Sequence, residues 1–261
     1  MKACAIIQSR MGSSRLPGKV LLPLADKPVL EHVIRRVQQA KTIQDVILAT
    51  TEKDEDTPLV ELAIRCGAKV YRGSENDVLD RYYQAAQKFK AKTVVRITAD
   101  CPVIDPKLID QIVTQYFQVK VDYCSNTLVE TFPNGEDIEV FSSQALEKAW
   151  KEARLSSERE HVTPYLKKNK EQFKVISFEG KSNLSDKRWT LDEDKDYRFL
   201  QILFDHLYVK NPYFGMDEIL KFLKDHPEAE QINAQIIRDE GYLKSLKKDQ
   251  EVSVRNKRIK A

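Results

Sequence analysis

The chain has 261 residues, of which 41% are hydrophobic and 32% are charged, and its formal net charge is +3. This composition is typical of a soluble globular protein and excludes an intrinsically disordered chain. No apolar run approaches the roughly 18 residues that a membrane-spanning helix needs, and the N-terminus lacks the layout of a signal peptide. We therefore expect a cytoplasmic protein with no membrane partner.

Positive charge is concentrated at the C-terminal end. Residues 244–261 hold seven Lys or Arg against two acidic residues, which leaves residues 1–243 slightly acidic. We therefore expect no nucleic-acid partner, and we interpret 246–261 as a basic C-terminal tail that is solvated and frayed. The four cysteines include no C-x-x-C pair, which favours free thiols over a zinc site or a disulfide framework.

The first half of the chain alternates between strand and helix patterns. Apolar or β-branched runs predict strands at 3–7, 46–49, 70–71 and 93–97, and three- or four-residue apolar spacing predicts helices from 28, over 57–66, over 77–90 and over 108–117. This order predicts a parallel α/β sheet with helices on both faces. Ligands bind such sheets beyond the carboxyl ends of the strands.

The second half changes character, and the sheet is expected to become mixed there. Strands are predicted at 122–125 and 136–141, on either side of a turn at 133–135, and at 173–178 and 188–191. Helices are predicted over 142–153, 159–168, 195–208, 216–225 and 229–246. Trp189 is expected in the core.

The loop after the first predicted strand carries three cations, Arg10, Arg15 and Lys19, around a small Gly12-Ser13-Ser14 centre. A guanidinium group can bind two phosphate oxygens at once, and Lys adds a point charge. The loop could therefore neutralise a triphosphate and later a leaving pyrophosphate. Its spacing is not that of a P-loop. The alternative is a solvated basic loop, but the position at a strand's carboxyl end favours the anion site.

Two acidic residues that follow predicted strands are candidate magnesium ligands. Asp100 follows the strand at 93–97, and Asp192 follows the strand at 188–191. Mg²⁺ binds carboxylate oxygens together with substrate phosphates and would polarise a phosphate under attack. The alternative for Asp100 is to cap the next helix, but Asp105 suits that task better. Nearby acidic residues at 194 and 196 are interpreted as caps of the following helix.

These residues carry a resemblance to a known family. The loop RMGSSRLPGK at 10–19 resembles the signature of sugar-activating cytidylyltransferases, the group of the CMP-ulosonate and CMP-acylneuraminate synthetases. Six further segments are similar to the spore-coat polysaccharide biosynthesis branch: DVLDRYYQA (77–85), RITADCPVID (96–105), DYCSN (122–126), PNGEDIEVF (133–141), EREHVTPYL (158–166) and RWTLD (188–192). The resemblance spans about residues 1–245.

The resemblance implies a three-layer nucleotidyltransferase fold of the GT-A, Rossmann-like type, with a mostly parallel mixed central sheet, over residues 1–245. It implies an enzyme that transfers CMP from CTP to a sugar or sugar-like acceptor with release of pyrophosphate, in surface polysaccharide or glycan biosynthesis. CTP would be the co-substrate and Mg²⁺ the cofactor. Such proteins commonly form homodimers, here through a hairpin at about 125–141, which also borders the sugar site.

Two other functions compete with this one. A GT-A glycosyltransferase would use a nucleotide-sugar, but the Asp-x-Asp sequences of this chain do not follow a mid-domain strand. A non-catalytic nucleotide-binding regulator would keep the cationic loop without needing two metal carboxylates.

By position, the resemblance places catalytic roles on four residues, of which the two acidic ones also bind the metal: Arg10, Lys19, Asp100 and Asp192. Nucleotide contacts are expected from the first loop and from the third strand–helix connection: Ser9, Arg10, Gly12, Ser13, Arg15, Lys19, Ser74, Asp77 and Arg81. For the last three the alternative is a helix cap with an i,i+4 pair between Asp77 and Arg81.

Acceptor contacts are expected from five residues: Arg96, Asp137, Glu139, His161 and Arg188. The two-residue period of a strand puts Asp137 and Glu139 on one face, where they either accept hydrogen bonds from sugar hydroxyls or face water. His161 suits proton transfer near neutral pH, but a lone helical His is usually structural. Arg188 is either a phosphate ligand or a surface cation.

Overall fold

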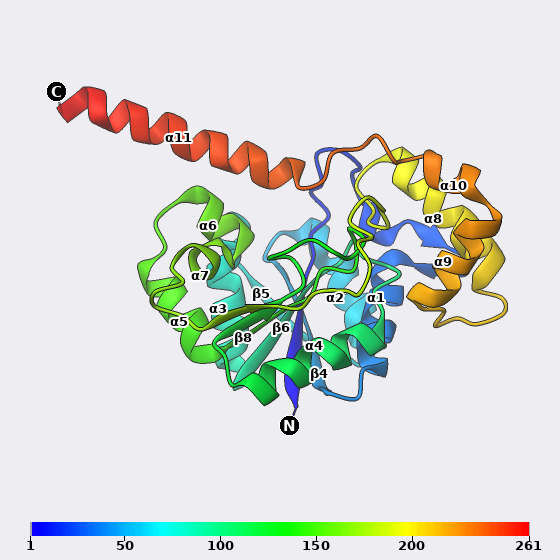
Figure 1. Cartoon of the computed structure of the whole chain (residues 1–261). Helices are drawn as coiled ribbons and strands as arrows, with labels where there is room; N and C mark the ends of the chain where they lie inside the picture. Colours follow the sequence, from blue (N-terminus) through cyan, green and yellow to red (C-terminus); the bar gives the residue numbers. More distant parts are fainter. Residues whose placement is uncertain (1, 261) are drawn as a thin grey trace.

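The computed structural model describes residues 2–260, with the side chains of residues 2–251. A seven-stranded sheet lies between two layers of helices (Figure 1). Its strands are β1 (Ala3–Gln8), β4 (Ile43–Thr51), β5 (Lys69–Gly73), β6 (Thr93–Thr98), β7 (Tyr123–Ser125), β8 (Glu139–Ser142) and β9 (Val175–Ser177). Two short strands, β2 (Pro23–Leu24) and β3 (Lys27–Pro28), form a separate hairpin.

The sheet has the order β5-β4-β1-β6-β8-β7-β9. The first four strands are parallel, β8 is antiparallel to both β6 and β7, and β9 is parallel to β7. The predicted parallel sheet that becomes mixed in the second half of the chain is therefore confirmed. In β6 the side chains of Val94, Val95 and Ile97 are fully buried, because helices cover both faces.

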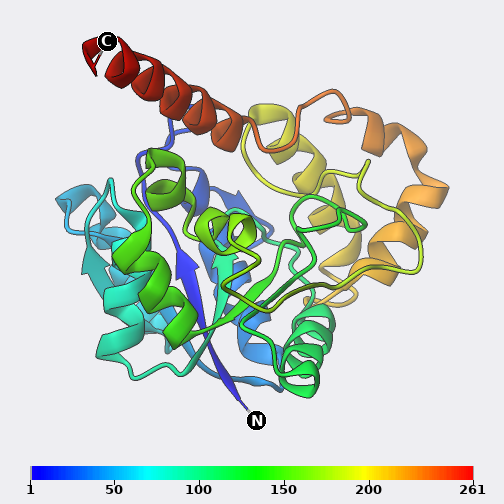
Figure 2. The same ribbon diagram turned by 60° about the vertical axis from the view of Figure 1, so that its left-hand side comes forward.

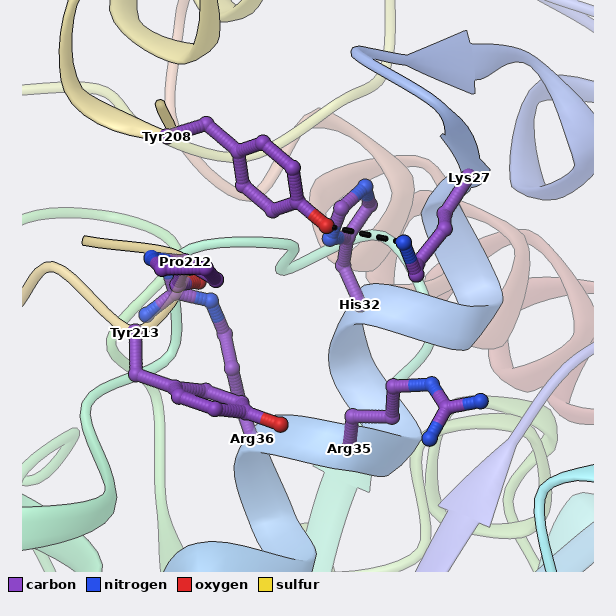
Figure 3. A pocket seen from close by; sticks show the side chains of 7 residues that line it. All are labelled: Lys27, His32, Arg35, Arg36, Tyr208, Pro212 and Tyr213. Atoms are coloured by element: carbon purple, nitrogen blue, oxygen red, sulfur yellow. Dashed lines mark hydrogen bonds between the residues drawn. The ribbon is translucent and has the colours of Figure 1, made fainter. Parts of the chain in front are cut away.

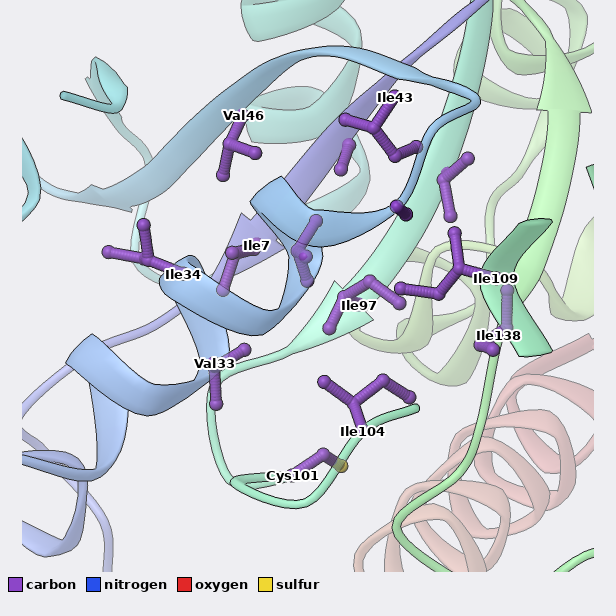
Figure 4. Packing of buried hydrophobic residues seen from close by; sticks show 14 of the residues in the cluster. Ile7, Val33, Ile34, Ile43, Val46, Ile97, Cys101, Ile104, Ile109 and Ile138 are labelled. Carbon is purple, nitrogen blue, oxygen red and sulfur yellow. The ribbon is translucent and has the colours of Figure 1, made fainter. Parts of the chain in front are cut away.

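Apolar stripes on the helices bury the two faces of the sheet. Helices α1 (Val29–Gln39), α2 (Thr57–Arg65) and α4 (Pro106–Val119) pack on one face, and α3 (Val78–Lys88) and α5 (Ser143–Glu152) pack on the other. Figure 4 shows Val33, Ile34 and Ile109 from the helices meeting Ile7 and Ile97 from the sheet.

A third apolar cluster lies beside the sheet, on the right of Figure 1. It is formed by α8 (Asp194–Leu207), α9 (Met216–Asp225) and α10 (Pro227–Gln231), with Leu24 of the small hairpin. Trp189 is fully buried in this cluster, which confirms it as a core residue. The segment that follows Trp189 is therefore held by this third cluster and not by the apolar cores that cover the sheet.

Two predicted helices are each split in two. The helix expected over 159–168 is replaced by α6 (Ser156–His161) and α7 (Pro164–Lys168), because Pro164 cannot continue a helix but suits its first turn. The helix expected over 229–246 is replaced by α10 and α11 (Glu240–Lys260), and Asp239 just before α11 has a left-handed backbone (φ 58°) that a helix cannot contain.

Helix α11 runs through the segment interpreted as a frayed tail, which is therefore helical to Lys260. It projects from the body of the molecule (Figures 1 and 2). Within residues 2–260 the structure shows no helix with the length and apolar character to cross a membrane.

Two predicted strands also differ. Residues 188–191 make only an isolated bridge between Asn134 and Arg188. The strand expected from 136 begins at Glu139, because the amide side chain of Asn126 takes the backbone groups before it: it donates to the Glu136 carbonyl at 2.6 Å and accepts from the Ile138 N–H at 2.9 Å.

Gly135 allows two loops to touch. Its backbone has φ 111°, and a Cβ there would lie 2.7 Å from the carbonyl carbon of Trp189 and 2.8 Å from the backbone nitrogen of Thr190. Beside it, the Trp189 N–H donates to the Asn134 carbonyl at 2.7 Å. Only glycine permits this approach without strain, and the approach fixes the segment that leads to Asp192.

We expect Gly135→Ala to lower the free energy of unfolding by about 3 kcal/mol, because left-handed strain and overpacking against a backbone add together. Gly67→Ala is the matched control, since Gly67 has φ 76° but open space around its Cβ position, and we expect it to cost about 1–2 kcal/mol. Urea unfolding measures both. Equal losses would contradict the role of the close approach.

Candidate active site

The site centres on Lys19, whose ammonium group gathers three distant segments. Its Nζ donates to Asp100 Oδ2 at 2.7 Å, to Asp192 Oδ1 at 2.6 Å and to the Leu191 carbonyl at 2.7 Å. Lys19 follows the loop after β1, and Asp100 follows β6, the neighbouring parallel strand. The carboxyl ends of these two strands therefore bring together residues that the sequence predicted to meet.

Backbone contacts fix the two acidic loops to each other. The Leu191 N–H donates to the Asp100 carbonyl at 2.8 Å, and the Thr190 hydroxyl donates to the same oxygen at 3.2 Å. Asp105, and not Asp100, caps α4 by accepting from the Lys107 N–H at 2.8 Å, as predicted. The Asp100 carboxylate is therefore available to the site.

The ion pairs keep Asp100 and Lys19 charged at neutral pH. Burial by itself would raise the pKa of Asp100, but the adjacent Lys19 ammonium reverses this and lowers it to about 2. Burial would lower the pKa of Lys19, and the two carboxylates raise it above its ordinary value. Two carboxylates and one ammonium leave one net negative charge, which suits the binding of a cation.

Two arginines extend this charge network around Asp192. Arg15 Nη2 lies 3.0 Å from Asp192 Oδ1, and its Nη1 lies 2.7 Å from Glu240 Oε2. Arg188 lies 3.6 Å from Asp192 but is held in a two-bond pair by the fully buried Asp196, at 2.8 and 2.9 Å. Arg188 is itself 6% exposed, so the alternative of a surface cation is wrong.

The predicted caps at 194 and 196 are partly confirmed. Asp196 accepts from the backbone N–H groups of Asp192 and Glu193 at 2.9 and 3.0 Å, so it caps α8. The same carboxylate also holds Arg188 in place. Asp194 is the first residue of that helix, where its charge suits the helix dipole.

The start of the cationic loop is shaped by a residue that sequence analysis missed, Asp56. Its buried carboxylate accepts from the Met11 N–H at 2.7 Å and from the Thr50 hydroxyl at 3.0 Å. Arg10 is directed to Glu75, 3.6 Å away, with 43% of its side chain exposed. Arg10 thus keeps a large exposed surface, in contrast to the buried Lys19.

The small residues of the loop have different surroundings. Ser9 is buried, and its hydroxyl has no hydrogen-bond partner among the described residues. Ser13 accepts from the Leu16 N–H at 3.3 Å. A Cβ on Gly12 would lie 3.6 Å from the Glu55 carboxylate, an ordinary contact distance.

At the third strand–helix connection Asp77 caps the helix, but the predicted ion pair between Asp77 and Arg81 is absent among the described residues. Asp77 caps α3 by accepting from the Asp80 N–H at 2.9 Å, and its carboxylate pairs with Arg159 instead of Arg81. Arg81 is buried and donates to the Ser74 carbonyl at 2.7 Å. Asp77 pairs with Arg159 because α6, which carries Arg159, packs against α3.

Glu139 on β8 lies in a buried polar network and does not face water. It pairs with Arg96 of β6 and accepts from the hydroxyls of Tyr123 and Thr163, and Lys167 Nζ lies 3.2 Å away. Burial would raise the pKa of this carboxyl, but the Lys167 and Arg96 charges lower it to about 2.

Asp137 and His161 contact the C-terminal segment. Arg238 Nη2 lies 2.6 Å from Asp137 Oδ1, and burial raises the pKa of this carboxyl to about 6. His161 Nε2 lies 3.1 Å from the Ser245 hydroxyl, and burial lowers its pKa. Strand β8 begins at Glu139, so Asp137 lies before the strand. Asp137 pairs with Arg238, whereas Glu139 pairs with Arg96.

A pocket of about 240 Å³ lies away from this cluster, between the small hairpin, α1 and the α8–α9 connection (Figure 3). Each of its three cations already has a partner: Lys27 bonds to Tyr208 at 3.0 Å, Arg35 to Glu31 at 2.7 Å, and Arg36 to the Phe214 carbonyl at 2.7 Å. These pairings make it a poor candidate for the nucleotide.

The carboxylate donors of the Asp100–Asp192 pair fit a magnesium ion. Within the part of the chain that the structure describes, no group of three or more His, Cys, Asp or Glu forms a complete metal cage. Mg²⁺ seldom uses such a cage and takes one or two carboxylates together with water and phosphate oxygens. Two carboxylates that share one ammonium supply that set.

The Glu139 network makes stability depend on pH. Because its folded pKa is lowered from 4.5 to about 2, its contribution is complete above about pH 4.5 and is lost as the pH falls toward 2. We expect Glu139→Gln to cost roughly 3 kcal/mol at pH 7, and this difference from the wild type should shrink at pH 3.

Urea unfolding at both pH values measures the difference. Glu147→Gln on the exposed face of α5 is the control, with little loss at either pH. A loss that is the same at pH 7 and pH 3 would show that the charge of Glu139 does not matter.

Comparison with known proteins confirms the family. A cytidylyltransferase profile matches residues 4–251. An uncharacterized protein of Methanocaldococcus jannaschii is 40% identical over 238 residues, which cover 90% of this chain and 96% of that protein. The spore coat polysaccharide biosynthesis protein SpsF of Bacillus subtilis is 32% identical over 231 residues, which cover 86% of this chain and 95% of that protein.

A solved structure agrees with the fold. The structure of a cytidylyltransferase from Leptospira borgpetersenii superposes with a TM-score of 0.84 at 35% identity, and the match covers 91% of this chain and 99% of that one. The predicted nucleotidyltransferase fold with a mostly parallel mixed sheet is thereby confirmed. This chain belongs to the cytidylyltransferase family and is a CTP-using enzyme.

Proposed function

We propose that the enzyme transfers CMP from CTP to a sugar or sugar-like acceptor and releases pyrophosphate, in the synthesis of a surface polysaccharide or glycan. The observation that carries this proposal is the Lys19 ammonium between the Asp100 and Asp192 carboxylates, beside Arg15. The similarity to a spore coat polysaccharide biosynthesis protein supports the acceptor class. Family membership favours this reaction over a glycosyltransferase or a regulator.

The loop cations would hold the nucleotide. Arg15 and Arg10 would bind outer phosphate oxygens, and Lys19 would reach a phosphate nearest the two carboxylates. Ser9, whose buried hydroxyl has no partner among the described residues, together with Gly12 and Ser13, would line the same loop. Ser74, Asp77 and Arg81 would border the nucleotide from the adjacent connection.

Asp100 and Asp192 would hold Mg²⁺, which when bound would neutralise phosphate charge and polarise the reacting phosphate. In the transfer, an acceptor oxygen attacks the α-phosphorus of CTP, a new oxygen–phosphorus bond forms, and the bond to the bridging oxygen of the β-phosphate breaks. An acceptor hydroxyl releases its proton to solvent in this step. The residues contribute mainly by positioning and charge neutralisation. Arg15 and Lys19 would stay with the departing pyrophosphate.

The acceptor would lie beyond the nucleotide, near Arg96, Asp137, Glu139, His161 and Arg188. Arg96 neutralises Glu139 and Arg238 neutralises Asp137, so the two carboxylates do not repel an acidic group. We propose further that two copies pair through the segment at about 125–141.

A direct assay tests the reaction. Purified enzyme with Mg²⁺ and CTP should release pyrophosphate only when a suitable acceptor from a panel of keto-sugar acids and phosphorylated sugars is present. UTP, GTP and ATP in parallel test the choice of nucleotide. Pyrophosphate release with another nucleotide but never with CTP would refute the proposal.

Asp100→Asn should lower the rate of pyrophosphate release by at least about 100-fold, because one phosphate-facing carboxylate is lost from the metal pair. The fold should persist, since an amide can still accept a hydrogen bond from Lys19, and circular dichroism checks this. Asp186→Asn, at a side chain that is 76% exposed, is the control. Wild-type turnover in Asp100→Asn would remove the metal assignment.

Arg15→Ala should weaken CTP binding by roughly tenfold or more, the worth of a charge-assisted hydrogen bond, while CMP binding changes little. The difference arises because Arg15 is proposed to contact the outer phosphates, which CMP lacks. Isothermal titration with both nucleotides gives the two affinities, with Arg65→Ala on exposed α2 surface as control. Equal losses for CTP and CMP would argue against triphosphate contact.

A further inference from the structure

The segment 238–249 contacts predicted site residues from three distant parts of the chain. Its contacts are Arg238 with Asp137 at 2.6 Å, Glu240 with Arg15 at 2.7 Å and Ser245 with His161 at 3.1 Å. The residues of this segment carry no motif, so its sequence predicts no site role. The family profile extends through it to residue 251.

Each of the two terminal nitrogens of Arg15 forms an ion pair with a carboxylate. Asp192 lies 3.0 Å from Nη2, and Glu240 lies 2.7 Å from Nη1. A phosphate that binds the guanidinium end-on, through both terminal nitrogens, competes for the same two nitrogens. A triphosphate bound to Arg15 in this way therefore displaces at least one of these carboxylates.

Glu240 is the carboxylate that leaves at lower cost. Its side chain is 37% exposed, against 20% for Asp192, so it regains water more easily. Its other oxygen accepts from Lys244 Nζ at 2.7 Å, so a counter-ion remains when Arg15 is taken. Asp192 is instead tied to Lys19 at 2.6 Å within the site.

We propose that Glu240 is a further residue of the nucleotide site, which occupies Arg15 in the ligand-free protein and is displaced by the triphosphate of CTP. The inference rests on the proposed role of Arg15. Helix α11 need not move, because it is held elsewhere: Ser245 donates to Glu160 at 2.7 Å, and the Ser157 N–H lies 3.3 Å from the Asp249 carboxylate. A change of side-chain rotamer in Glu240 is sufficient.

Competition of this kind lowers the affinity for anions. An exposed ion pair contributes modestly, so its loss should change a dissociation constant by a small factor. We expect Glu240→Gln to bind CTP roughly two- to fivefold more tightly than the wild type, and inorganic tripolyphosphate likewise. CMP, which lacks the outer phosphates, should bind with unchanged affinity.

Isothermal titration of the full chain with CTP, tripolyphosphate and CMP measures these affinities. Glu147→Gln is a matched control, because Glu147 also pairs with a Lys four residues later, Lys151, at 2.7 Å, and its side chain is 38% exposed. It loses the same charge away from the cationic loop. Its dissociation constants should equal those of the wild type.

The outcomes separate this inference from the proposed function. If the wild type binds CTP, but Glu240→Gln binds both CTP and tripolyphosphate no more tightly than the wild type does, the displacement is overturned and the function stands. If the wild type binds tripolyphosphate but not CTP, the function fails, and the displacement is decided by tripolyphosphate alone. Binding of neither ligand by the wild type overturns both.

Discussion

The ammonium group of Lys19 lies between two carboxylates that come from separate loops, Asp100 after β6 and Asp192 after the buried Trp189. A buried ammonium is costly unless it is paired and hydrogen-bonded, and here two carboxylates and the Leu191 carbonyl satisfy it. Removing either loop from its place would leave buried charge uncompensated. The cationic loop, the sheet edge and the third apolar cluster are therefore bound to one another by electrostatics.

Packing decides where these charges meet. Lys19 and Asp100 follow neighbouring strands of the sheet, whereas Asp192 follows a loop without strand structure. That loop is held by Trp189 in the third cluster and by the close approach of Gly135. The site thus lies where the sheet meets a separate apolar core, and its geometry depends on both. A change in either core would move one carboxylate relative to the other.

Local sequence patterns predicted the features that interactions between neighbouring residues control. Apolar periodicity gave the parallel strands, and the strand ends brought Lys19 and Asp100 together because parallel strands share one carboxyl edge. Partners chosen by tertiary packing were not predictable: Asp77 pairs with Arg159 of α6, not with Arg81 four residues away. The contacts of Arg238 and Glu240 were missed for the same reason, since charged residues outside a motif carry no signal of their distant partners.

The balance of charge explains why an occupied Arg15 matters. Lys19, Arg15, Arg188 and Lys244 contribute four positive charges to the central network. Its four carboxylates, Asp100, Asp192, Asp196 and Glu240, contribute four negative ones. This network has no excess positive charge to offer a polyphosphate. This network attracts a polyphosphate when a carboxylate withdraws or when the nucleotide arrives with its own cation. Asp196 is fully buried, and Asp100 and Asp192 are bound to Lys19, so Glu240 is the carboxylate whose withdrawal disturbs the site least.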